Sequence, residues 1–338
     1  MKILLISPTE KGIGGVAQHV SGLLKFLINN GHSVEIISSE NTFTIPIKGL
    51  KNPSFMLSSF LKTKFKKNYD IVHAHNVPSA FAMKNVVGKK VLTLHGIYSQ
   101  QIDILHGKTI GKISGTVEEE ALGWADVITV ISKEAQDYYH KIGYKTHYIP
   151  NAIDLNSLPQ GEKRLYDKQL IFAGRISKEK GILNLLTVAE KLPPDIHMII
   201  VGSGNEEKKV KDAAKKLSNL HFLGYQPREE TIKLIRGSDI LIQPSLVEGT
   251  STSLLEAMAC KTVIIATEIG GNKEIIENDK TGLLVPPDSH EKILEQIINL
   301  YSDKDKFNNL AKNALVKVKE YDWTKVGIQY LQIYSNLL

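Results

Sequence analysis

The chain has 338 residues, 42% of them hydrophobic and 23% charged, as is typical of a globular protein. This length exceeds that of most single hydrophobic cores and predicts two domains. No apolar run is long enough to cross a membrane, and the single cysteine, Cys260, excludes a disulfide framework. We therefore expect a cytoplasmic protein.

Short apolar strands alternate with helical patterns over residues 1–155. Because such alternation is typical of parallel sheets covered on both faces, this part is predicted to be a doubly wound α/β domain. We expect strands over residues 2–7, 33–39, 70–74, 90–94, 126–131 and 147–149. Helices are expected over residues 16–30, 118–124 and 134–142.

The periodicity fails over residues 156–168, which predicts a linker. A second α/β domain is expected over residues 169–320, and the helical residues 321–338 are predicted to return to the first domain. The strands expected in the second domain are residues 169–173, 197–201, 221–223, 239–242, 262–266 and 282–285, followed by helices over 291–301 and 306–320. Two such domains would face each other across a central cleft.

The net charge of +6 is concentrated in residues 1–155, which hold 17 lysines and 12 acidic residues. Six lysines lie between Lys48 and Lys67, interleaved with apolar residues and without an acidic residue. Such a segment fits peripheral contact with an anionic membrane, and the protein could then work at the inner face of the cell membrane. A surface helix packed on its own domain is the alternative. Nucleic acid is not expected, because no binding motif accompanies the charge.

Glycines and charges follow several predicted strands. Gly12, Gly14 and Gly15 precede the first helix, where backbone N–H groups can approach a phosphate. In the second domain, Arg175 ends the first strand and Lys180 follows five residues later. Because Arg offers a planar fork and Lys a point charge, this pair can hold a diphosphate.

Two carboxylates, Glu248 and Glu256, flank the start of a helix after the strand at residues 239–242. The helix entry at Gly249, Thr250 and Ser251 would attract an anion. A ligand that is part phosphate and part polyhydroxyl, such as a sugar nucleotide, suits this arrangement.

In number, order and spacing, these motifs resemble those of glycosyltransferase family 4, the retaining group with the GT-B fold. The resemblance covers essentially the whole length. Its marks are Gly14-Gly15, Asp70-Ile71-Val72-His73-Ala74-His75, Thr93-Leu94-His95-Gly96, Pro150-Asn151-Ala152-Ile153-Asp154, Gly174-Arg175, Lys180-Gly181, Val201-Gly202-Ser203-Gly204, Phe222-Leu223-Gly224, Glu248 with Glu256, and Gly270-Gly271-Asn272-Lys273-Glu274.

The resemblance implies a role for each site residue in transfer from a UDP- or GDP-linked sugar to a glycan, lipid-linked or small-molecule acceptor. The four catalytic residues are His95 near the anomeric centre, Arg175 and Lys180 on the diphosphate, and Glu248 on the transferred sugar. The donor-binding residues are Gly14, Gly15, Gly174, Gly202, Leu223, Gly224, Tyr225, Gly249, Thr250, Ser251, Thr252 and Glu256, the last of them on the ribose.

No cofactor and no metal are expected, because Arg175 and Lys180 can replace a cation and Asp303-Lys304-Asp305 is read as a solvated face. Departures from the family pattern include Thr250 and Ser251, where bulkier residues are frequent, and Ala152, where glycine is usual. The alternatives are a sugar-nucleotide epimerase, a non-catalytic binding protein and a dehydrogenase.

Overall fold

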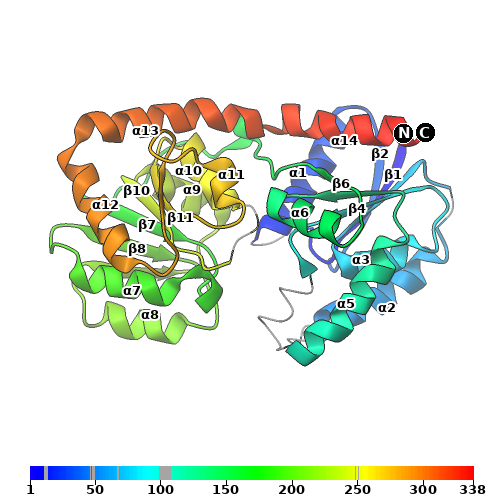
Figure 1. Ribbon diagram of the computed structural model, residues 1–338, viewed down its shortest axis with the longest axis horizontal. Helices are drawn as coiled ribbons and strands as arrows, with labels where there is room; N and C mark the ends of the chain where they lie inside the picture. Colours follow the sequence, from blue (N-terminus) through cyan, green and yellow to red (C-terminus); the bar gives the residue numbers. More distant parts are fainter. Residues whose placement is uncertain are drawn as a thin grey trace. The chain divides into compact units, whose positions relative to one another are not determined.

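The computed structural model forms two compact units, each built around one sheet (Figure 1). The first unit contains Met1–Ala152 and Trp323–Leu338, and the second contains Ile153–Asp322. The structure describes residues 1–10, 14–45, 47, 50–66, 68–98, 108–247, 249 and 251–338, and for 108–114 the backbone.

All strands of the first sheet are parallel, and their order is β2-β1-β3-β4-β5-β6. The chain therefore moves to one edge with β2 and then returns past β1 to build the other half, as in a doubly wound fold. The bounds are β1 Lys2–Ile6, β2 Ser33–Ile37, β3 Ile71–His75, β4 Lys89–Leu94, β5 Val127–Val130 and β6 Thr146–Tyr148.

The helices of the first unit include the last one of the chain, α14, which packs against α1. The two helices approach closely: a Cβ on Gly22 of α1 would lie 2.1 Å from the Trp323 indole of α14. The bounds are α1 Gly15–Asn29, α2 Lys51–Thr63, α3 Val77–Met83, α5 Lys108–Leu122, α6 Lys133–Lys141 and α14 Trp323–Leu337.

The second sheet is also parallel, with the order β12-β11-β10-β7-β8-β9. Its strands are β7 Gln169–Ala173, β8 His197–Val201, β9 Leu220–Gly224, β10 Ile240–Gln243, β11 Val263–Thr267 and β12 Leu283–Val285. Its helices are α7 Ile182–Lys191, α8 Glu207–Ala214, α9 Arg228–Arg236, α10 Thr252–Ala259, α11 Asn272–Ile275, α12 His290–Ser302 and α13 Lys304–Lys317. Short 3₁₀ turns are η1 Leu155–Ser157, η2 Lys178–Lys180 and η3 Val318–Tyr321.

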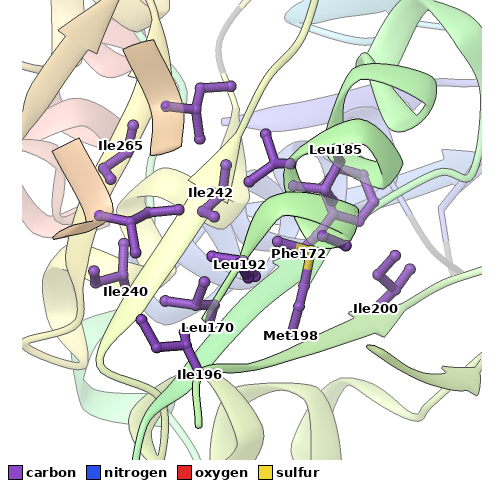
Figure 2. Close-up of a cluster of buried hydrophobic side chains, with 14 of the residues drawn as sticks. Leu170, Phe172, Leu185, Leu192, Ile196, Met198, Ile200, Ile240, Ile242 and Ile265 are labelled. Carbon is purple, nitrogen blue, oxygen red and sulfur yellow. The ribbon is translucent and has the colours of Figure 1, made fainter. Parts of the chain in front are cut away.

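Buried side chains alternate between the two faces of each sheet, as the period of two in a strand requires. In β7, Leu170 and Phe172 join one core, and Ile171 and Ala173 join the core on the opposite face. Figure 2 shows Leu170 and Phe172 in the first of these cores. Because both faces are covered, the strands are mostly apolar, and the polar residues that follow them collect at the ends of the sheet.

The twelve predicted strands are all present, which confirms the α/β class with two doubly wound sheets. The helix boundaries differ more from the predicted ones than the strand boundaries do. Helix α5 begins at Lys108, ten residues before the predicted start, because Gly111 and Gly115 are weak helix formers that hide the pattern. None of the described helices is both long enough and apolar enough to span a bilayer.

Candidate functional site

The candidate site in the second unit lies at the carboxyl end of its sheet, between β7 and β10. These two strands are neighbours, but the chain leaves them toward opposite edges of the sheet. Such a reversal point leaves room for a ligand beyond the strand ends. The predicted residues Gly174 and Arg175 follow β7, and the segment that leads to Ser251 follows β10.

Two glycines hold the loops at this end in close contact. Gly202, after β8, has a φ of +140°, and a Cβ there would lie 1.8 Å from the Gly174 carbonyl oxygen. Gly181 has a φ of +67°, and its Cβ would lie 1.8 Å from the Pro244 carbonyl oxygen. Since only glycine tolerates both the conformation and the approach, these residues fix the loop positions.

The predicted diphosphate-binding pair lies on the loop after β7. The Arg175 side chain is 63% exposed, and its Nη1 donates to Glu179 Oε1 at 3.3 Å. Such an exposed pair is weak, so the guanidinium can reorient toward an anion. Lys180 is half-buried at the end of η2. The Glu179 carbonyl accepts from Leu246 N at 2.8 Å, which ties this loop to the segment after β10.

Glu256 is buried on α10 and is held by an arginine from α9. Arg228 Nε donates to Glu256 Oε1 at 3.1 Å, while the Arg228 side chain stays partly exposed. A buried carboxylate that lost this partner would be strongly destabilising. Arg228 therefore fixes the orientation of the Glu256 carboxylate.

Neutral polar groups surround the start of α10. Ser251 Oγ lies 2.8 Å from Ser253 Oγ, which donates to Gln243 Oε1 at 3.4 Å, and Gln243 Nε2 donates to Ser245 Oγ at 2.9 Å. Among the described residues, no backbone N–H of α10 donates to the Ser251 side chain. This helix start can therefore receive an anion. Thr252 is its first residue, and Gly249 is half-buried.

The predicted Glu248 and Thr250 lie outside the described residues. Of the residues predicted to line the base, Leu223 and Gly224 end β9 and Tyr225 follows it. Gly224 has a φ of +65°, and its carbonyl accepts from Gly202 N at 2.9 Å. Leu223 is half-buried and Tyr225 is exposed. The second unit thus brings its described donor-binding residues to one end of one sheet.

The remaining predicted site residues belong to the first unit. Gly14 has a φ of +129° and caps α1, which begins at Gly15, and its carbonyl accepts from Gln18 N at 3.2 Å. Gly12 lies outside the described residues. His95 follows β4, and its backbone N–H donates to Asn76 Oδ1 at 2.9 Å.

His95 belongs to a cluster of buried histidines that sequence reasoning did not assemble. Its Nε2 lies 3.2 Å from His75 Nδ1, so one ring donates to the other. His19 of α1 packs edge-on against His95, with ring centroids 4.9 Å apart. His19 Nδ1 is hydrogen-bonded to Asn151 Oδ1 at 2.9 Å and its Nε2 to the Tyr330 hydroxyl at 3.1 Å.

Burial keeps these histidines uncharged. It lowers the pKa of His19 to about 4, although the Asn151 hydrogen bond opposes the shift. Burial, with repulsion from His19, lowers the pKa of His73 to about 3. The pKa values of His75 and His95 are also lowered well below the usual value by burial and by the neighbouring rings. At neutral pH all four act as hydrogen-bonding groups without charge.

Among the described residues, one group has the proximity that a metal ion needs. One ring nitrogen each from His19, His75 and His95 lie within 4.8 Å of one another. Neutral imidazole is the form that binds metals. However, both His19 nitrogens are already hydrogen-bonded, so a metal would have to break one of these bonds. The geometry therefore favours a hydrogen-bonded network.

Sequence reasoning missed Arg228, His19 and Asn151 as supporting residues. Arg228 lies 28 positions from Glu256, and Asn151 lies 132 positions from His19. The one available signal is that Arg228 is one of few arginines in a chain rich in lysine. Nothing local in the sequence indicates these pairings.

The chain matches two glycosyltransferase family models. Residues 13–157 match "Glycosyltransferase Family 4" and residues 156–316 match "Glycosyl transferases group 1". Among curated proteins, phosphatidyl-myo-inositol mannosyltransferase from Mycolicibacterium smegmatis is 26% identical, over all of this chain and 94% of that protein. An uncharacterized glycosyltransferase from Methanocaldococcus jannaschii is 25% identical, over 96% of this chain and 94% of that protein.

Solved glycosyltransferases share the fold. Sucrose-phosphate synthase from Thermosynechococcus elongatus superposes with a TM-score of 0.85 at 20% identity, over 99% of this chain and 98% of that one. HepE from Anabaena, in complex with UDP-glucose, gives 0.76 at 19% identity, over 99% of this chain and all of that one. The two family models together span both units, and each unit contains one doubly wound parallel sheet, as in the GT-B fold. The chain therefore belongs to glycosyltransferase family 4.

Proposed function

We propose that the protein is a retaining glycosyltransferase that moves a sugar from a UDP- or GDP-linked donor to an acceptor hydroxyl. One observation carries the proposal. Arg175, Lys180 and the ion-paired Glu256 lie at the carboxyl end of the same sheet, beside loops that glycines hold together. This combination offers cations to a diphosphate and a fixed acceptor of hydrogen bonds to a ribose. The UDP-glucose in HepE supports a donor of this class.

The donor roles follow from the chemistry of each group. Arg175 and Lys180 stabilise the charge that grows on the departing diphosphate, and the backbone at Gly14 and Gly15 meets its distal phosphate. Glu256 accepts from the ribose hydroxyls and Glu248 from hydroxyls of the transferred sugar. The backbone around Gly174, Gly202 and residues 223–225 accommodates the nucleoside, with residues 249–252 at the helix entry.

His95 has an atom suited to a ligand. Its Nδ1 is buried and, like His75 Nε2, has no hydrogen-bond partner among the described residues. Because a buried polar atom without a partner is costly, a sugar hydroxyl near the anomeric centre would satisfy His95 Nδ1.

The reaction needs no covalent intermediate and no metal in this proposal. The bond from the anomeric carbon to the leaving phosphate oxygen breaks, and the acceptor oxygen bonds to that carbon on the same face. The acceptor proton passes to the leaving phosphate. Glu248 is then not a nucleophile, and a trapped glycosyl ester on Glu248 would contradict this mechanism. Activity that a chelator abolishes would contradict the metal-independent part.

We further propose that the acceptor is a membrane-borne glycan or lipid in the synthesis of a cell-surface polysaccharide or glycolipid. The curated mannosyltransferase is named for a phosphatidylinositol acceptor, which supports this class. The lysine-rich segment supports a cytoplasmic protein acting at the inner face of the cell membrane, where anionic lipids concentrate. A soluble acceptor remains the alternative.

A thermal-shift screen of sugar nucleotides tests the donor assignment. A ligand at about 100 times its dissociation constant adds about 2.7 kcal/mol to the stability of the folded state. We expect one UDP- or GDP-sugar to raise the midpoint, and Glu256→Ala to remove about half of the shift. NAD serves as the control, because a dehydrogenase would respond to NAD instead. If no sugar nucleotide raises the midpoint, the donor assignment is wrong.

Product analysis distinguishes the proposed transferase from an epimerase and from a non-catalytic binding protein. With donor and acceptor together, a transferase forms a glycoside. A sugar-nucleotide epimerase would change the donor without an acceptor, and a non-catalytic protein would bind the donor without turnover.

A further inference from the structure

The helix α2 buries one face and exposes leucines on the opposite one. It packs on α3 in the first unit (Figure 1), and its buried residues Phe55, Ser59 and Thr63 repeat every four positions. Leu57 and Leu61 lie on the opposite side, and Leu57 is 63% exposed. At 100° per residue, both leucines lie about 180° from the buried row. Within the described part of the first unit, this stripe therefore covers no core.

A second segment widens this apolar surface. Ser58 Oγ donates to the Phe43 carbonyl at 2.6 Å, and Ile45 N donates to Ser54 Oγ at 2.9 Å, so residues 43–45 run along α2. Phe65, just after the helix, is 86% exposed. We define the α2 face as the exposed apolar residues Phe43, Ile47, Leu50, Leu57, Leu61 and Phe65. An apolar surface of this kind marks an interaction site.

The charge around the α2 face is positive. Lys51 and Lys64 are exposed at its two ends. Two other lysines are engaged within the unit: Lys62 Nζ donates to the Asn41 carbonyl at 2.6 Å, and Lys66 pairs with Glu35 of β2. Lys48 and Lys67 lie outside the described residues. The sequence has no acidic residue between Glu40 and Asp70, so no acidic residue of this segment balances the charge at the rim.

This charge selects the partner. A second copy docking through the same face would bring like charges together, which opposes association. An anionic bilayer offers phosphates to the lysines and an apolar interior to the leucines and phenylalanines. We propose that the α2 face docks on an anionic lipid bilayer. This deepens the proposed function by naming the surface that carries the acceptor, and it rests on that function only for the choice of acceptor.

Vesicle cosedimentation of the full chain tests the docking. We expect binding to phosphatidylcholine vesicles that contain phosphatidylserine to exceed binding to phosphatidylcholine alone by about tenfold or more, and to weaken with salt. Leu57→Ser with Leu61→Ser should reduce binding about tenfold or more, because two anchors are lost without a change of charge. Lys64→Ala should reduce it about fivefold.

The matched control is Ile28→Ser on α1 of the same unit, since Ile28 is 52% exposed and lies outside the α2 face. It should leave binding unchanged. Circular dichroism checks that each variant is folded. The proposal is overturned if the wild type ignores anionic vesicles, if Ile28→Ser weakens binding as much, or if the double variant still binds. The proposal is also overturned if the wild type is a dimer in solution and the only effect of Leu57→Ser/Leu61→Ser is to dissociate it, because the α2 face would then bind a second copy of the chain.

Failure of the docking and failure of the proposed function are distinguishable. The sugar-nucleotide thermal shift should be the same in Leu57→Ser/Leu61→Ser as in the wild type, because no residue of the α2 face is among the proposed donor-binding residues.

Discussion

The carboxyl ends of the two sheets carry different polar chemistry. In the first unit, His19, His73, His75 and His95 are buried and held uncharged by burial. In the second unit, Arg175 is exposed and Glu256 keeps its ion pair with Arg228. The carboxyl end of a parallel sheet can therefore carry either neutral, hydrogen-bonded side chains or charged ones. A side chain stays charged there when it has an ion-pair partner or is exposed to solvent.

The largest expected effect comes from removing the exposed cation. Arg175→Ala should lower kcat about 10²- to 10³-fold, because the guanidinium stabilises charge that develops on the leaving diphosphate. Steady-state kinetics with the donor from the thermal-shift screen measure it. Lys178→Ala is the matched control, since Lys178 is an exposed lysine on the same loop. A rise in donor KM alone would assign Arg175 to binding.

The close loop contacts of the second unit should be the next most sensitive feature. Gly202→Ala should reduce the free energy of unfolding by about 3 kcal/mol, because its Cβ collides with the Gly174 carbonyl. Urea denaturation measures it. Gly143→Ala separates strain from collision, since Gly143 has a φ of +93° but nothing within 4 Å of its Cβ. Equal losses would mean that backbone strain alone matters.

The buried histidines should make the protein acid-sensitive. Above pH 6.5 their imidazoles are neutral in both states, but below it the unfolded chain binds protons that the folded state excludes. Stability therefore falls as pH falls, and the lowered pKa values of His19 and His73 each contribute about 2 kcal/mol to this loss at pH 5. Thermal unfolding at pH 7 and pH 5 measures the difference. His19→Gln should make the loss of stability between pH 7 and pH 5 smaller. His147→Gln changes an exposed histidine and should leave that loss unchanged. An equal reduction in both would contradict the assignment to the buried cluster.

The smallest expected effect tests whether Arg228 orients the Glu256 carboxylate. Glu256→Ala should raise the donor KM about tenfold with a smaller change in kcat, because one charged hydrogen-bond acceptor is lost. Arg228→Ala should act in the same direction. The double variant should then be no worse than the more severe single variant, since both changes act on one group. Additive effects would show that Arg228 acts independently of Glu256.

The local pattern was enough for the strands and for the position of the candidate residues along them. Runs such as residues 170–173 and 240–242 are apolar on both faces, and the glycines and charges after them must fall at the carboxyl end of a parallel sheet. The first residues of helices were harder to predict from the sequence. Helix α5 begins among residues of weak helix propensity, where packing determines whether the helix forms.

The sequence by itself determined the two doubly wound sheets, the family, and the placement of Arg175 and Glu256 beyond strands, because each depends on neighbours along the chain. Only the tertiary structure decided which groups meet. Arg228 finds Glu256, Asn151 finds His19, and Lys66 finds Glu35 through packing across 28, 132 and 31 positions. Such contacts depend on how helices cover a sheet, and no local periodicity records that geometry.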